Sequence, residues 1–205
     1  MTASNSLKVT APEICLRFRN WFLLLPVLLI ALPANSSELS AILATSRVAP
    51  PSSVAFQEER HNPMFEQPLV VEGYLEYVSE GVLRKVIESP FEEMLSIEAG
   101  ELVITRDGTT HKLPVRRNKS LEALLGAFEA LLSGDATRLE AVFDHEVSGD
   151  ASIWMIDLTP KSRRVGKHLS SVQVSGDSRG VGKLLIHLDD GEWHVMSIQH
   201  EVPGS

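Results

Sequence analysis

Apolar and polar residues alternate through much of the chain between positions 54 and 113. Within 69–78, for example, Leu75 and Tyr77 alternate with Tyr74 and Glu76. A period of two is typical of a strand with one buried face. Turn residues interrupt the pattern at short intervals, and Asp107-Gly108 is a strong hairpin signal. This segment therefore predicts about six short strands in an antiparallel meander.

The period changes to three and four in the middle of the chain, which predicts one face of a helix. The apolar stripe of this helix consists of Leu121, Leu124, Leu125, Phe128, Leu131 and Leu132. Asn118 or Ser120 is a suitable N-cap, and Gly134 suits the C-terminal end. Asp135 is a suitable cap for a second, shorter helix that carries Leu139 and Val142. The stripe fits either a helix packed on a sheet or a movable plug over an apolar cavity, and spacing leaves both open.

Alternation returns after this helix pair, and Trp154, Ile156 and Leu158 share one face of a strand. Later runs and Asp190-Gly191 predict further hairpins, for about four or five strands in all. A short helix capped by Ser37 precedes the first strand. The predicted order is one helix, about six strands, two helices and four or five strands, which is an α+β fold that is mainly β.

The N-terminus has the order of a secretory signal. Arg17 and Arg19 precede the apolar run 21–32, and small residues follow it. The run is shorter than the ~20 apolar residues of a membrane span, although a single N-terminal anchor helix is the alternative. Cleavage is expected after Ala34 or Ser36. We therefore expect residues 1–36 to be removed and 37–205 to form a single domain in the bacterial periplasm.

Composition narrows the function. With 43% hydrophobic and 22% charged residues, the chain has the balance of a globular domain. The formal net charge of −8 disfavours nucleic acid or an anionic membrane surface as partner. The single cysteine, Cys15, lies in the predicted signal, so the mature chain has neither a disulfide nor a cysteine nucleophile.

No motif of catalysis is complete. The segment 176–183 resembles a phosphate-binding loop, but five residues separate Gly176 from Gly182 where four are required, so a turn is predicted. His187 and Asp189 share a strand face, and His194 could join them across the hairpin as a third metal ligand or as part of a hydrolase site. A solvated polar face is the favoured interpretation, and no metal or cofactor is predicted. The acidic pairs at 58–59 and 92–93 are likewise interpreted as solvated charges.

Several segments in a fixed order resemble a known family. They are SVAFQEER at 53–60, EGYLEY at 72–77, the strand 83–88 ending in Ser89-Pro90, GELVI at 100–104, the mid-chain helices and WMIDLTP at 154–160. Together with the export signal, this order resembles the LolA-type outer-membrane lipoprotein carriers, and more narrowly their divergent relatives. The resemblance covers about residues 39–198.

The resemblance implies an unclosed antiparallel β-barrel, a half-barrel of about ten or eleven strands, with a helical lid over an apolar cavity. It implies a non-enzymatic periplasmic carrier that binds acyl chains of a lipid or lipoprotein and passes them between an inner-membrane exporter and an outer-membrane acceptor. The arginine-proline step of classical carriers is replaced here by 78–81, VSEG, which favours a different lipid cargo. The alternative function is an envelope interaction or sensor module with a filled core.

Alternation and helical spacing together nominate the side chains that would line such a cavity. These candidates are Leu75, Tyr77, Leu83, Leu125, Phe128, Trp154, Ile156 and Leu158. Each of them also fits ordinary packing between a sheet and helices.

Overall fold

The protein is represented by a computed structural model that describes residues 35–200. The predicted secretory signal lies outside these residues, apart from its last two positions, which begin the first helix. The described residues contain eleven strands, four α-helices and one 3-10 helix. Among them, no helix combines the length and the hydropathy needed to cross a membrane.

The strands form one antiparallel sheet in the order β6-β5-β4-β3-β2-β1-β11-β10-β9-β8-β7. Their bounds are β1 Ser52–His61, β2 Leu69–Ser79, β3 Val82–Ser89, β4 Glu93–Glu98, β5 Glu101–Arg106, β6 Thr109–Pro114, β7 Phe143–Gly149, β8 Ile153–Pro160, β9 Ser171–Asp177, β10 Gly180–His187 and β11 Trp193–Gln199. Two meanders, β1–β6 and β7–β11, are joined where β1 pairs with β11. Strands β6 and β7 are the two edge strands and do not pair with each other, so the sheet of the described residues is not closed. This confirms the predicted half-barrel.

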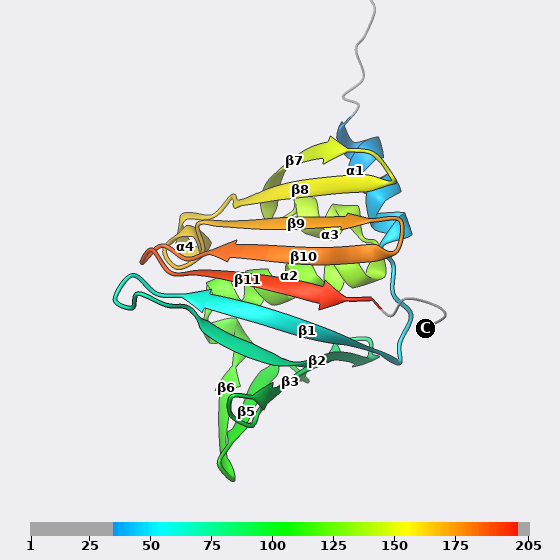
Figure 1. Ribbon diagram of the computed structural model, residues 1–205. Helices are drawn as coiled ribbons and strands as arrows, with labels where there is room; N and C mark the ends of the chain where they lie inside the picture. Colours follow the sequence, from blue (N-terminus) through cyan, green and yellow to red (C-terminus); the bar gives the residue numbers. More distant parts are fainter. Residues whose placement is uncertain (1–34, 201–205) are drawn as a thin grey trace, which may run out of the picture. The chain divides into compact units, whose positions relative to one another are not determined.

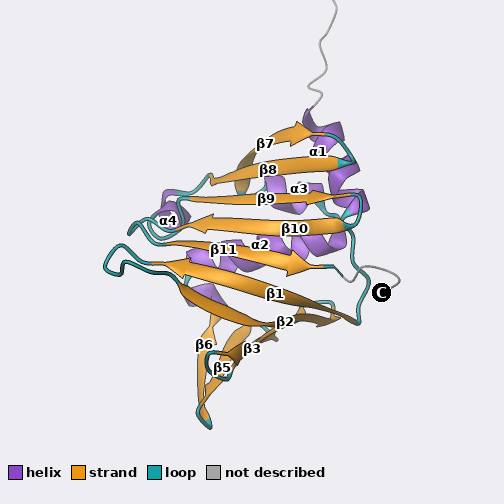
Figure 2. Ribbon diagram, viewed as in Figure 1, coloured by secondary structure: helices purple, strands orange, loops and turns teal. Residues whose placement is uncertain are grey.

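The helices lie on one face of this sheet, as Figures 1 and 2 show. Their bounds are α1 Asn35–Thr45, η1 Val115–Arg117, α2 Lys119–Ser133, α3 Ala136–Glu140 and α4 Arg163–Gly166. Asn118 caps α2 by accepting hydrogen bonds from two backbone N–H groups, and Gly134 ends it with φ of 73°. Asp135 caps α3 by accepting a hydrogen bond from Arg138 N. The three caps agree with the sequence prediction.

The sheet has an inner face toward the helices and an outer face, and strand register assigns each side chain to one of them. We call the inner face of β1 and β7–β11 the filled region. It carries Phe56, Trp154, Ile156, Leu158, Val172, Val174, Leu184 and Met196, all buried. Leu39, Ile42 and Leu43 of α1, together with Leu139 of α3, belong to the same core.

Helix α2 packs against this core mainly through alanine side chains, and several leucines of its predicted apolar stripe are only partly buried. Ala123, Ala127 and Ala130 are buried together with Leu131, whereas Leu121 and Leu125 are only half-buried. Alanine allows a helix backbone to approach the sheet closely, and the longer leucines then lie along its flanks. Ser120 Oγ donates to Val165 O at 2.8 Å, which ties the start of α2 to α4.

Two local features differ from the sequence prediction. Helix α4 was not predicted, because a single turn capped by Ser162 is too short to show a period. Helix α3 ends at Glu140, so Val142 lies beyond it. The segment resembling a phosphate loop is the β9–β10 hairpin, as the sequence predicted.

Candidate functional site

The inner face of β2–β6, which we call the open region, keeps most of its apolar side chains partly accessible, although Val71, Ile87 and Leu102 are buried. Register arranges these side chains in three rows across the strands. Row one consists of Tyr77, Leu83, Ile97, Leu102 and Leu113. Row two consists of Leu75, Lys85, Leu95, Ile104 and His111. Row three consists of Gly73, Ile87, Glu93, Arg106 and Thr109.

Within the three rows, the apolar side chains that stay accessible lie in rows one and two, because Ile87 of row three is buried. Among the apolar members of rows one and two only Leu102 is fully buried, and Leu113 is 49% exposed. Contiguous apolar surface that is left accessible often marks a binding site. The open region is therefore the candidate functional site.

A pocket of about 390 Å³ lies between this region and helix α2. The β2–β3 and β4–β5 turns form one wall of it. Its apolar lining comes from Val82, Ile97, Val115 and Leu125, and its charged lining comes from Glu80, Glu122, Glu129 and Arg138. The pocket thus adjoins row one at Ile97, and carboxylates form part of its lining.

One face of α2 supplies the helical wall of this pocket. Glu122, Leu125, Gly126 and Glu129 follow each other at helical spacing and all line it. A Cβ atom added at Gly126 would meet no heavy atom within 4 Å. The glycine therefore leaves open space in the middle of this wall, which sequence spacing alone had not singled out.

The structure divides the eight predicted cavity residues into three groups. Trp154, Ile156 and Leu158 are fully buried in the filled region. Leu75 and Phe128 are half-buried and pack against that core. Tyr77, Leu83 and Leu125 are half-buried outside it, and of these Leu125 lines the pocket.

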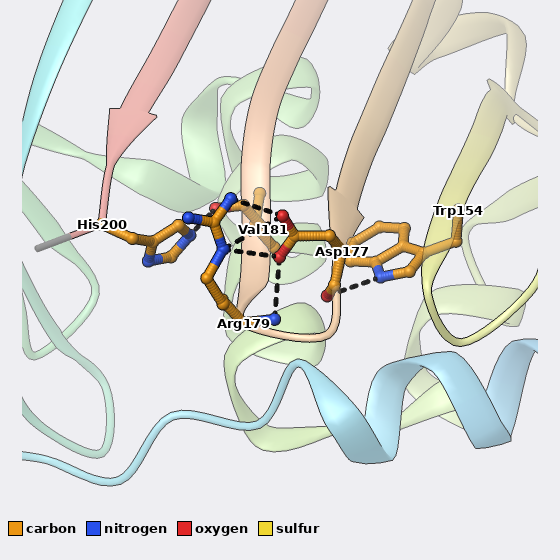
Figure 3. A network of polar contacts seen from close by, with 5 residues as sticks. All are labelled: Trp154, Asp177, Arg179, Val181 and His200. Carbon is orange, nitrogen blue, oxygen red and sulfur yellow. Dashed lines mark hydrogen bonds and ion pairs between the residues drawn. The ribbon is translucent and has the colours of Figure 1, made fainter. Parts of the chain in front are cut away.

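Trp154 is held at the β9–β10 hairpin, where Figure 3 shows its indole pointing toward Asp177. The indole N–H donates to the backbone oxygen of Asp177 at 3.2 Å. Hydrogen bonds from Arg179 lower the pKa of the Asp177 carboxyl to about 2. His200 contacts Val181 O at 2.8 Å beside this pair. Such fixed contacts are typical of a structural core residue.

A charged cluster of Glu58, Arg60, Lys85 and His194 interrupts the inner face, and its members come from β1, β11 and β3, with Lys85 reaching across β2. Lys85 Nζ donates to Glu58 Oε2 at 2.6 Å, and Arg60 Nε donates to the same oxygen at 2.9 Å. His194 Nδ1 lies 3.3 Å from Glu58 Oε1. The Lys85 ammonium also lies 4.8 Å from the ring centre of Phe56.

Glu58 is only 3% exposed, which corrects the sequence interpretation of a solvated charge. Burial alone would raise the pKa of this carboxyl, but His194, Lys85 and Arg60 outweigh that effect and lower the pKa to about 2. Burial lowers the pKa of the Lys85 ammonium, and its attraction to Glu58 offsets part of that effect. Sequence could not identify this cluster, because Lys85 is distant from Glu58 along the chain.

The hypothesis that His187, Asp189 and His194 form one site is wrong. His187 pairs with Trp193, and His194 pairs with Ile186, so the two histidines project from opposite faces of the sheet. A hydrolase centre that uses both histidines is excluded for the same reason. In residues 35–200, no three His, Cys, Asp or Glu side chains are grouped to hold a metal ion.

An unclosed antiparallel sheet, with helices on one face and an accessible apolar surface beside them, defines a half-barrel. The family described as outer membrane lipoprotein carrier protein LolA-like matches residues 31–183. The chain therefore belongs to this LolA-like family. No curated protein matches the chain.

Solved structures resemble the chain in fold. A LolA superfamily protein from Nitrosomonas europaea has 10% identity and a TM-score of 0.42, over 81% of this chain and 95% of that one. The lipoprotein LppX of Mycobacterium tuberculosis has 11% identity and a TM-score of 0.44, over 82% and 94%. The MucA/MucB complex of Pseudomonas aeruginosa has 13% identity and a TM-score of 0.41, over 83% and 58%. Similarity at this level carries no information on function.

Proposed function

We propose that this protein is a non-enzymatic periplasmic carrier that binds acyl chains of a lipid or lipoprotein on its open region. The observation that carries the proposal is the accessible apolar surface of rows one and two, which adjoins the pocket beneath α2. Each methylene group that such a surface removes from water contributes about 0.8 kcal/mol. Membership of a family described by lipoprotein carriage supports this function.

The carrier would exchange its ligand with one partner at each membrane. An inner-membrane exporter would supply the acyl chains and an outer-membrane acceptor would receive them. Removal of residues 1–36 would release residues 37–205 as a single domain into the periplasm. Tyr77, Leu83 and Leu125 would contact the acyl chain directly, whereas Trp154, Ile156 and Leu158 would support the wall behind it.

The direct test is native mass spectrometry of the protein produced from the full-length chain and purified from a bacterial periplasm. A mass that lacks residues 1–34 or 1–36, with a co-purifying lipid, is the expected result. Organic extraction of that lipid would identify the class of cargo. An apo mass with no uptake of acyl probes would instead favour the interaction module, for which the filled region provides a solid core.

Gly126 offers a matched pair of variants for the pocket. Gly126→Phe is expected to reduce the uptake of acyl probes severalfold, because a ring at this position occupies the open space. Gly126→Ala should bind like the natural protein, since its methyl group meets nothing within 4 Å. Equal uptake by both variants would show that acyl chains do not enter the pocket.

A further inference from the structure

The open region is polarised along its strands. Row one, next to the pocket, is entirely apolar. Row three lies beyond row two along the strands and holds Glu93 and Arg106. The Arg106 Nη1 and Glu93 Oε2 atoms lie 3.9 Å apart. The Lys85 ammonium lies over Phe56, which pairs with Gly73 of row three. The charged cluster therefore lies at the row-three end, opposite the pocket.

The two ends also differ in the sign of their charge. Three carboxylates and one guanidinium line the pocket. In the charged cluster, two cations, Arg60 and Lys85, surround the single carboxylate of Glu58. An anionic group on the inner face is thus repelled from the pocket end and attracted to the cluster end.

The two cations retain hydrogen-bonding capacity. Arg60 bonds to Glu58 through Nε alone, and its two terminal nitrogens make no hydrogen bond within residues 35–200. Lys85 gives one of its three N–H groups to Glu58. Their side chains remain 26% and 18% exposed. A guanidinium fork beside an ammonium is well suited to a carboxylate or phosphate.

We propose that the open region takes an amphiphile with one anionic head group, a carboxylate or a phosphate, and holds it in a defined direction. The head group contacts Arg60 and Lys85, and the apolar chain runs along rows two and one into the pocket. This inference rests on the proposed acyl binding and adds the charge and orientation of the ligand. From Leu83 to Ile87 the strand offers about 13 Å of length for the chain.

Glu58 acts in this arrangement as a positioning residue. Its carboxylate holds the Lys85 ammonium and the Arg60 guanidinium on the inner face, which neither long side chain would maintain alone. A neutral head group would gain nothing from these donors. A cationic head group would be repelled by them and would favour the pocket end instead.

The first experiment compares probes with one alkyl chain length and different head groups on the natural protein. Dodecyl phosphate and dodecanoate are expected to bind about tenfold or more tightly than dodecyl maltoside, as charge-assisted hydrogen bonds imply. Dodecyltrimethylammonium should bind most weakly. Added salt should narrow the gap between the anionic and neutral probes, because these cations are partly exposed.

The second experiment uses variants of strand β3. Lys85→Met should weaken both anionic probes about tenfold relative to dodecyl maltoside, which serves as the neutral reference on the same variant. Arg84→Met is the matched control, since Arg84 lies on the outer face, paired with Glu76, and should change none of the probes. Lys85→Met leaves the buried Glu58 carboxylate without its ammonium partner, and the double variant Glu58→Gln with Lys85→Met removes that carboxylate charge as well. The probe comparison on the natural protein tests the proposal even if a variant fails to fold.

The outcomes separate the two proposals. Binding of every probe with equal affinity, or preference for the cationic probe, would overturn the anionic head-group site while acyl binding stands. Failure of all four probes to bind would overturn acyl binding and this inference with it. Anionic preference that persists unchanged in Lys85→Met would also overturn the assignment to this cluster.

Discussion

On strands β8, β9 and β10 the apolar inner-face side chains are buried, whereas on β2–β5 most of those in rows one and two remain partly exposed and only Val71, Ile87 and Leu102 are buried. Both regions use alternating apolar residues in antiparallel strands. They differ in what covers them, because α1, the alanine face of α2 and α3 contribute their side chains to the core of the filled region. One sheet thus provides both a stabilising core and an accessible surface, and the placement of the helices separates them.

The largest expected effect contrasts the same substitution in the two regions. Leu158→Ala, in the filled region, should lower the free energy of unfolding by about 2–5 kcal/mol, because it leaves a cavity among fully buried side chains. Leu83→Ala, in the open region, should cost about 1 kcal/mol or less, since its side chain is already half-exposed. Urea unfolding followed by circular dichroism measures both. Equal losses would contradict the division into two regions.

The charged cluster predicts a sensitivity to acid. Since Glu58 has a pKa of about 2 in the folded protein and 4.5 as its ordinary value, its ionised form stabilises the fold above pH 4.5. That contribution, on the order of 3 kcal/mol, should disappear as the pH falls from about 4.5 to about 2. Unfolding curves across this range should show a smaller loss for Glu58→Gln than for the natural protein. Parallel losses in the two proteins would argue against this role of Glu58.

A methyl group added in the filled region should be destabilising. In Gly176→Ala the new Cβ would collide with the backbone oxygen of Gly180 and with the ring of Trp154. The expected cost is about 1–3 kcal/mol in the free energy of unfolding. Gly182→Ala, in the next strand, is the control, because its Cβ would meet only ordinary van der Waals neighbours near 4 Å. Equal melting temperatures for Gly176→Ala and Gly182→Ala would contradict the predicted collision at Gly176.

The smallest expected effect is a gain in the free energy of unfolding, from a substitution in helix α2 beside the open region. Gly126→Ala should raise the free energy of unfolding by about 0.5–1 kcal/mol, because alanine favours the helical backbone and nothing obstructs its methyl group. Chemical denaturation of the two proteins side by side measures the difference. A destabilised Gly126→Ala protein would mean that the wall of α2 is already filled.

Local signals in the sequence were sufficient for most of the elements. The period of two in 69–78, the turn at Asp107-Gly108 and the caps at Asn118 and Gly134 all act within a few residues, so they are visible along the chain. The order of these elements supported the half-barrel and the family. The turn of α4 escaped prediction because one turn has too few residues to show a period.

The candidate site depended on pairings across long stretches of chain. Alternation nominated Leu83 and Trp154 equally, and only the position of the helices separates an accessible side chain from a core one. The pairing of β1 with β11 brings His194 to Glu58, and the pairing through β2 brings Lys85 to the same carboxylate. Sequence by itself determined the strands, hairpins and helices, because hydrogen bonding and side-chain period are local. The tertiary structure decided which face is filled and which charges meet, because those depend on strand order and on where the helices pack.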